Sequence, residues 1–163
     1  MTYTTGQLIE ASDYNGFVAN NTYNVNSWWS TGSGDSGWGQ TALSSVSQNN
    51  LIYASNWASL VNTIQTAANH TGTSITSRTA PTVGVLITPM PNINTDIAAV
   101  NSNRGNAVAS GSTNASWSGS TAVTGTVGSG NQNWTITWTS TVTFDSADQA
   151  RYFFNAGGLI RIS

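Results

Sequence analysis

The sequence predicts an α+β fold, with an N-terminal helical hairpin or bundle that contains an internal repeat and a C-terminal antiparallel sheet with a short helix. Two observations carry this prediction. Residues 8–18 and 51–61 share one motif, and the apolar spacing changes from helical to a period of two near Ala115. We therefore expect a helical part over residues 1–105 and a β-rich part over residues 113–163.

The repeat organises the helical part. The two copies stand at a constant offset of 43 positions, and each begins with Leu-Ile-x-Ala-Ser followed by an aromatic residue two positions later. We expect Ser12 and Ser55 to cap helices, because a serine hydroxyl accepts from the free N–H groups of a first helical turn. Tyr14 and Trp57 are then expected at equivalent sites, near a pseudo-two-fold axis.

Helical spacing continues beyond each copy of the motif. The second copy predicts a helix over residues 55–70, and the first predicts one over 13–30 that its asparagines weaken, since asparagine competes with the helix backbone. These two helices are expected to pack as a hairpin with their aromatic faces together. A third helix is expected over residues 91–103, with Pro91 in its first turn.

Residues 31–40 form a loop, because they contain four glycines. This loop lacks the preceding strand, following helix and lysine of a phosphate-binding loop. Trp38 lies within it, and two alternatives remain open: the ring enters a groove of a neighbouring subunit, or it folds back on its own core.

The β-rich part alternates threonine with larger apolar residues over 134–144, which is typical of a half-buried antiparallel hairpin. A short helix follows, with Asp145 or Ser146 as its candidate cap. Leu159, Ile160 and Ile162 then form a last short strand that closes this sheet, pairs with another chain, or is cut short. Together with Trp38, these three are the candidate subunit-interface residues.

Charge is scarce, at 6% of the residues and a net −2, with four arginines and no lysine. This composition argues against a nucleic-acid partner and a membrane partner, and no signal peptide is visible.

The chain has no cysteine, so a disulfide framework is excluded. Serine, threonine and asparagine number 22, 24 and 19. A neutral surface of this kind gives little repulsion between copies, which favours a permanent place in an assembly.

Catalytic and metal-binding constellations are not apparent. His70 is the only histidine, and we expect it to bond the last carbonyls of its helix rather than serve a hydrolase triad. Asp145 and Asp148 fall short of the six or more oxygens that a hard cation requires. Glu10 and Asp13 are a poor glycosidase pair, because the second copy of the motif has Tyr53 and Asn56 in their place. We expect no catalytic residue, cofactor or metal.

Three strings together resemble virion structural proteins of tailed phages, especially those of cyanobacterial and other aquatic hosts. They are GDSGWGQT (34–41), HTGT (70–73) and the string from Phe144 through ADQARYFFNAGG (147–158) to Arg161. The last is the most specific. Trp38 and Thr71 depart from the tyrosine and glutamine expected at their positions, and relatives often continue past the Gly-Gly strand. The resemblance implies a tail, neck or baseplate component.

Two functions follow as hypotheses. The first is a non-enzymatic virion building block that is assembled in the host cytoplasm and contacts its own copies and other virion proteins. The alternative is a carbohydrate-binding host-adhesin module that presents exposed tryptophans to a host surface glycan. Tryptophan burial discriminates between them, since an adhesin exposes two or three in a row and a building block buries them.

Overall fold

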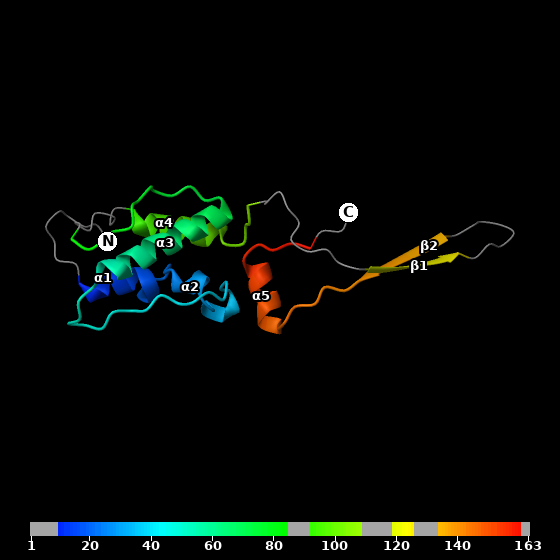
Figure 1. Ribbon diagram of the computed structural model, residues 1–163, viewed down its shortest axis with the longest axis horizontal. Helices are drawn as coiled ribbons and strands as arrows, with labels where there is room; N and C mark the ends of the chain where they lie inside the picture. The colour runs from blue at the N-terminus through cyan, green and yellow to red at the C-terminus, as the bar shows by residue number, and fades with distance from the viewer. Residues whose placement is uncertain (1–9, 85–91, 109–118, 126–133, 161–163) are drawn as a thin grey trace. The chain divides into compact units, whose positions relative to one another are not determined.

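The computed structural model describes residues 10–84, 92–108, 119–125 and 134–160. It divides the chain into a helical unit, Met1–Val108 with Ser146–Ser163, and a hairpin unit, Ala109–Asp145. Within the described ranges, no helix has the length and apolar content that a membrane span requires. The described elements, in chain order, are α1 (Ala11–Asn15), the π-helical turn η1 (Gly16–Asn20), α2 (Asn26–Trp29), the 3-10 turn η2 (Ser33–Asp35), α3 (Ala54–Thr71), α4 (Ile93–Asn103), β1 (Gly119–Gly125), β2 (Trp134–Ser140) and α5 (Ala147–Asn155) (Figure 1).

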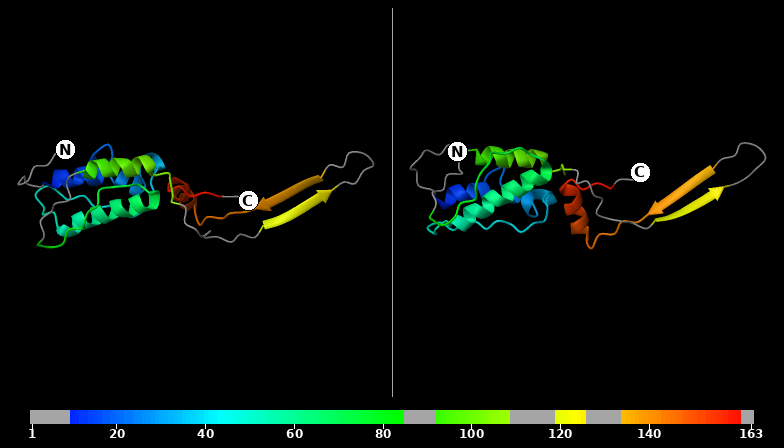
Figure 2. Two further views of the ribbon diagram at one scale, coloured as in Figure 1. Left: turned by 90° about the horizontal axis from the view of Figure 1, so that it is seen from above. Right: turned by 45° about the horizontal axis from the view of Figure 1, so that its top comes forward.

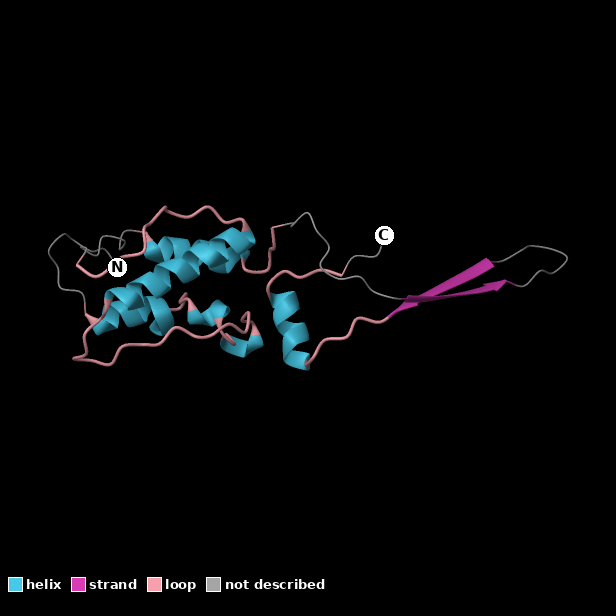
Figure 3. Cartoon of the chain, viewed as in Figure 1, coloured by secondary structure: helices cyan, strands magenta, loops and turns pink. Residues whose placement is uncertain are grey.

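The predicted α+β class is wrong, because the part of the described chain that packs around a core is all-helical (Figure 3). Among the described residues, β1 and β2 pair only with each other, antiparallel, with Val123 opposite Ile136, and they lie in a unit of their own. The helix α5, expected beside a sheet, belongs instead to the helical unit. A period of two identifies strands, but a two-stranded hairpin without a third strand or a covering helix builds no core.

The core of the helical unit centres on Trp57 of α3. Helices α3 and α4 pack against each other (Figure 2), and the α1–η1 segment contacts both. The ring of Trp57 meets the rings of Tyr14 and Phe17 edge to face, at centroid distances of 5.4 and 6.0 Å. Burial raises the pKa of the Tyr14 phenol, although a hydrogen bond with Asn56 partly opposes this. The core residues are Tyr14, Phe17, Val18, Val25, Trp28, Trp38, Trp57, Leu60, Ile64, Ala67, Ala68, Ile93, Ile97 and Val100.

The two copies of the repeat begin their helices at equivalent residues, Ala11 and Ala54, but the predicted caps Ser12 and Ser55 are wrong. Both serines lie inside the first turn. The backbone N–H before each helix donates instead to the side chain three residues on: Glu10 N to Asp13 Oδ2, and Tyr53 N to Asn56 Oδ1, both at 2.9 Å. The repeat therefore preserves a capping interaction through an Asp or Asn side chain, one half of a capping box.

The helix predicted over residues 13–30 is broken, whereas α3 and α4 match the other two predicted helices to within two residues. The first helix widens into η1 and ends at Asn21, whose backbone is extended. Asn24 then bonds the backbone on both sides, donating to Asn21 O at 2.7 Å and accepting from Ser27 N at 2.9 Å. These are the competing contacts that make asparagine a poor helix residue, and here they end one helix and start α2.

Two more asparagines pair with the extended segment that follows the glycine-rich loop. The Asn15 carboxamide donates to Val46 O and accepts from Val46 N, both at 2.8 Å. The Asn26 carboxamide makes the same two bonds with Leu43, at 2.8 and 2.9 Å. Each carboxamide thus bonds both the C=O and the N–H of one residue, as a neighbouring β-strand would. These bonds hold the extended segment against the helices without a sheet.

A buried ion pair anchors the segment after α3. Arg78 in this segment pairs with Asp96 of α4, and both side chains are almost fully buried. Asp96 also accepts from the backbone N–H of Thr76 at 3.2 Å. The segment therefore lies fixed across α4, because a buried carboxylate needs charged and hydrogen-bonding partners.

We predict that Asn56→Ala lowers the free energy of unfolding by about 1 kcal/mol, the usual worth of a helix cap, because the N–H of Tyr53 loses its acceptor. Ser55→Ala is the matched control, since Ser55 is exposed and does not cap α3. Urea unfolding of both variants measures the difference. A larger loss for Ser55→Ala than for Asn56→Ala would contradict the assigned cap.

Candidate functional site

Trp38 joins three distant parts of the helical unit. Its side chain is buried, with 6% of the residue exposed, and its ring packs against those of Trp28, Trp29 and His70 at 5.5, 6.1 and 5.1 Å. The indole Nε1–H donates to the carbonyl of Arg104, just after α4, and to that of Asn155, the last residue of α5, both at 3.2 Å. Trp38 thereby holds the exit of α4 and the end of α5 to the glycine-rich loop.

His70, in the last turn of α3, binds the chain on both sides of the hairpin unit. Its Nε2 lies 2.7 Å from the carbonyl oxygen of Ala156, and its own carbonyl accepts from the N–H of Val108 at 2.9 Å. Val108 is the last residue before the hairpin unit, and Ala156 directly follows α5. The predicted role for His70, bonding the last carbonyls of α3, is replaced by a contact between α3 and the C-terminal segment.

Asn155 reaches across to the glycine-rich loop. Its carboxamide Nδ2 donates to the carbonyls of Asp35 and Gly37, at 2.8 and 2.9 Å. Arg151, one turn earlier, pairs with the carboxylate of Asp35 at 2.7 Å and with that of Asp148 at 3.1 Å. α5 is thus held by directional polar contacts, since none of its residues is fully buried.

Two glycines permit this close approach. Gly157 has φ of 82°, and a Cβ there would lie 2.7 Å from Gly105 O and Ala107 N. Gly39 has φ of 71°, and a Cβ there would lie 2.3 Å from the ring of Tyr152. Both positions therefore need glycine for backbone conformation and for space.

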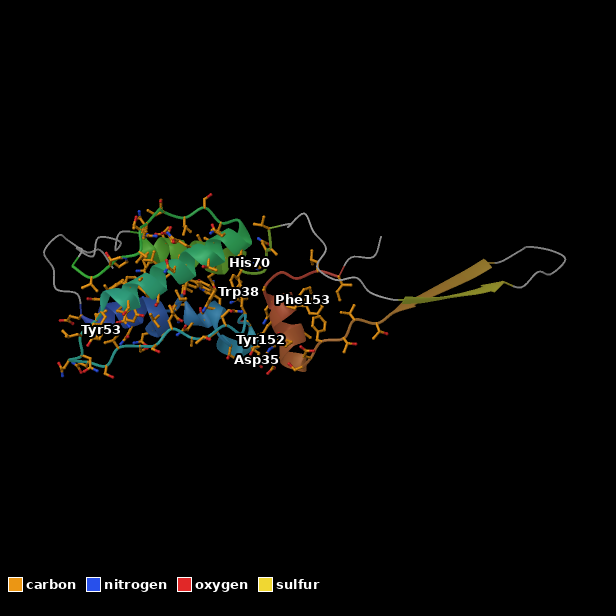
Figure 4. All side chains as sticks on the ribbon, in the orientation of Figure 1. Asp35, Trp38, Tyr53, His70, Tyr152 and Phe153 are labelled. Carbon is orange, nitrogen blue, oxygen red and sulfur yellow. The ribbon has the colours of Figure 1, made fainter. Side chains whose placement is uncertain are left out.

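We call the group formed by Trp38, His70, Asn155, Ala156 and Gly157 the Trp38 node. Figure 4 shows Trp38 and His70 where the loop, α3 and α5 meet, with Tyr152 and Phe153 on α5 and Tyr53 at the far end of the helical unit. For Trp38, the structure has the ring folded back on its own core. Asn155 and Gly157 were missed from the sequence, where the stretch 155–158 indicated only a helix end.

The other candidate residues are not members of the node. Ser146 is the N-cap of α5, and its hydroxyl accepts from Gln149 N at 3.1 Å. Leu159 and Ile160 are exposed, at 86% and 43%, and do not form the expected strand. Ile162 lies outside the described residues.

The node offers hydrogen-bonding groups and aromatic rings, and its one imidazole, that of His70, contacts the carbonyl of Ala156. Among the described residues, no three His, Asp or Glu side chains gather as they do around a metal ion. No family model, no curated protein and no solved structure matches this chain.

We predict that Gly157→Ala releases α5 from the helical unit, whereas Gly84→Ala does not. The two glycines have nearly equal φ, 82° and 83°, but a Cβ at Gly84 meets no atom of the described residues within 4 Å. Both variants carry the left-handed strain of about 1–2 kcal/mol, so any further loss in Gly157→Ala reports the close contact with residues 105–107. Chymotrypsin cleavage at Phe153 and Phe154 measures the release. Equal protection of α5 in both variants would contradict the contact.

Proposed function

We propose that this chain is a non-enzymatic virion structural protein of a tailed phage, a tail, neck or baseplate component that acts through contacts with its own copies and with other virion proteins. The observation that carries this proposal is the convergence of the three strings that resemble that family. Trp38 comes from the first string, His70 from the second, and Asn155 to Gly157 from the third. They lie far apart in the sequence and meet at the Trp38 node.

This convergence gives the three strings one shared structural task. A glycine-rich loop, the end of a helix and an Asn-Ala-Gly-Gly turn join the C-terminal segment to the helical core. Joining these segments requires close packing and hydrogen bonds, and the sole histidine makes one of these structural contacts. It therefore supports a building block over a catalyst.

The environment of the tryptophans also favours a building block over the tryptophan-presenting adhesin. The structure describes the side chains of four tryptophans. Trp28, Trp38 and Trp57 are buried, and Trp29 is half-buried with its indole N–H donated to Thr41 O at 3.1 Å. These four do not form an exposed row, which a stacking platform for a polysaccharide requires.

Leu159 and Ile160 supply the surface through which we expect copies to associate. They follow the node directly, so their backbone is positioned by the contacts of Ala156 and Gly157. Both side chains are apolar and exposed, and on this ground we place the contact surface here. Subunit contacts are rich in apolar groups and poor in charge at their centre, as this segment is.

We predict that the purified chain forms oligomers and that the double variant Leu159→Asp/Ile160→Asp is monomeric, because two carboxylates would have to be desolvated in the contact. Multi-angle light scattering measures the mass. Val83→Asp is the control, since Val83 is equally apolar and 93% exposed but lies elsewhere in the helical unit.

Electron microscopy of the particle with a labelled chain completes the test. We expect density for the chain in the tail, neck or baseplate. A monomeric wild-type chain with no density in the virion would contradict the proposed function.

A further inference from the structure

A depression of about 420 Å³ lies beside the Trp38 node. Three parts of the helical unit form it: the glycine-rich loop with the end of α2, the second half of α3, and one face of α5 (Figure 4). Its volume falls within the range of small-ligand sites, roughly 300–1,000 Å³. The lining residues are Trp29, Trp38, Gln40, Thr66, His70, Gln149, Tyr152, Phe153 and Ala156.

The aromatic rings of this depression are held in place by the surrounding structure. The indole N–H of Trp29 donates to Thr41 O, and its ring packs against that of Trp38 at an interplanar angle of 56°. Tyr152 lies against Gly39, and Phe153 lies against Gly158, so closely that a Cβ on either glycine would clash with the ring. Rings fixed in this way lose little conformational entropy when a ligand arrives.

The lining of the depression is neutral and rich in hydrogen-bonding groups. Of the residues that line it, none is Asp, Glu, Lys or Arg. Arg151, whose guanidinium lies over the Tyr152 ring, is paired with two carboxylates, those of Asp35 and Asp148. An anionic ligand would have to compete with both. The carboxamides of Gln40 and Gln149 and the hydroxyl of Thr66 each donate and accept, as sugar hydroxyls do.

We propose that this depression binds a neutral saccharide. The apolar C–H face of a sugar ring matches the Phe153 ring, which is 40% exposed, and its hydroxyls match the carboxamides of Gln40 and Gln149. This site differs from the row of exposed tryptophans considered from the sequence, because it is a single depression whose exposed ring comes from α5. It does not depend on the proposed function, since a building block and an unassembled chain present the same lining.

The test is a titration of the full chain, followed by tryptophan fluorescence, since Trp29 and Trp38 both line the depression. The probes are the neutral trisaccharides maltotriose, cellotriose and triacetylchitotriose, with trigalacturonic acid as an anionic probe. We expect saturable binding of at least one neutral trisaccharide with a millimolar Kd, and none of the anionic probe.

Two variants and one matched control locate the binding. Phe153→Ala should weaken it about tenfold, the effect of one lost aromatic stacking contact, and Gln149→Ala should weaken it while leaving the core intact. Tyr23→Ala is the control, because it removes another exposed aromatic ring of the helical unit, 54% exposed, that does not line the depression. Far-UV circular dichroism checks that each variant retains its helices.

Three outcomes would overturn the proposal. They are the absence of a saturable signal with every neutral probe, binding that Phe153→Ala and Gln149→Ala leave unchanged, and preference for trigalacturonic acid. Light scattering of the same samples separates this result from the proposed function. If protein concentration alone changes the fluorescence and sugar does not, association of copies accounts for the signal and the saccharide proposal fails.

Discussion

The attachment of α5 and of the exit of α4 to the glycine-rich loop depends on one buried indole N–H. A buried donor must find an acceptor, and Trp38 Nε1 finds two, at Arg104 and Asn155, which come from opposite ends of the hairpin unit's insertion. With no disulfide and few charges, such contacts have to connect distant segments. This donor links the glycine-rich loop to the exit of α4 and to the end of α5, and Tyr152 and Phe153 of α5 line the depression.

The scarcity of charge is compensated by carboxamides within the described part of the chain. Asn15 and Asn26 each pair with both backbone groups of one residue in the extended segment, and Asn155 bonds two carbonyls of the loop. Asn56, at the start of α3, accepts from the backbone in the same manner. A neutral surface and a well-connected interior are thus compatible, because one side-chain type both donates and accepts. This property suits a protein that we propose to work packed among its own copies.

Much of the helical unit could be predicted from the sequence, because its signals are local. The apolar period predicted α3 and α4, and the repeat predicted that its two copies begin helices at equivalent positions, which the structure has at Ala11 and Ala54. The caps were misassigned because the helices begin at Ala11 and Ala54, one position before the serines, which leaves Asp13 and Asn56 to accept from the backbone N–H that precedes each helix. The fold class was wrong because a period of two does not reveal how many strands pair. The node could not be predicted from the sequence, since its contacts join distant residues. Asn155 bonds Asp35, more than one hundred positions away, and Gly157 lies against Gly105, some fifty positions away.

Hydrogen exchange of the α5 amides in Trp38→Phe tests the central claim most directly. This variant keeps an aromatic ring and removes the N–H, and a helix as short as α5 is not stable when undocked. Trp28→Phe is the comparison, because Trp28 is also fully buried but its Nε1 has no partner among the described residues. In Trp38→Phe we expect the α5 amides to lose their protection while those of α3 and α4 keep theirs. In Trp28→Phe we expect the α5 amides to exchange at the same rate as those of the rest of the helical unit. Full protection of α5 in Trp38→Phe would contradict the account.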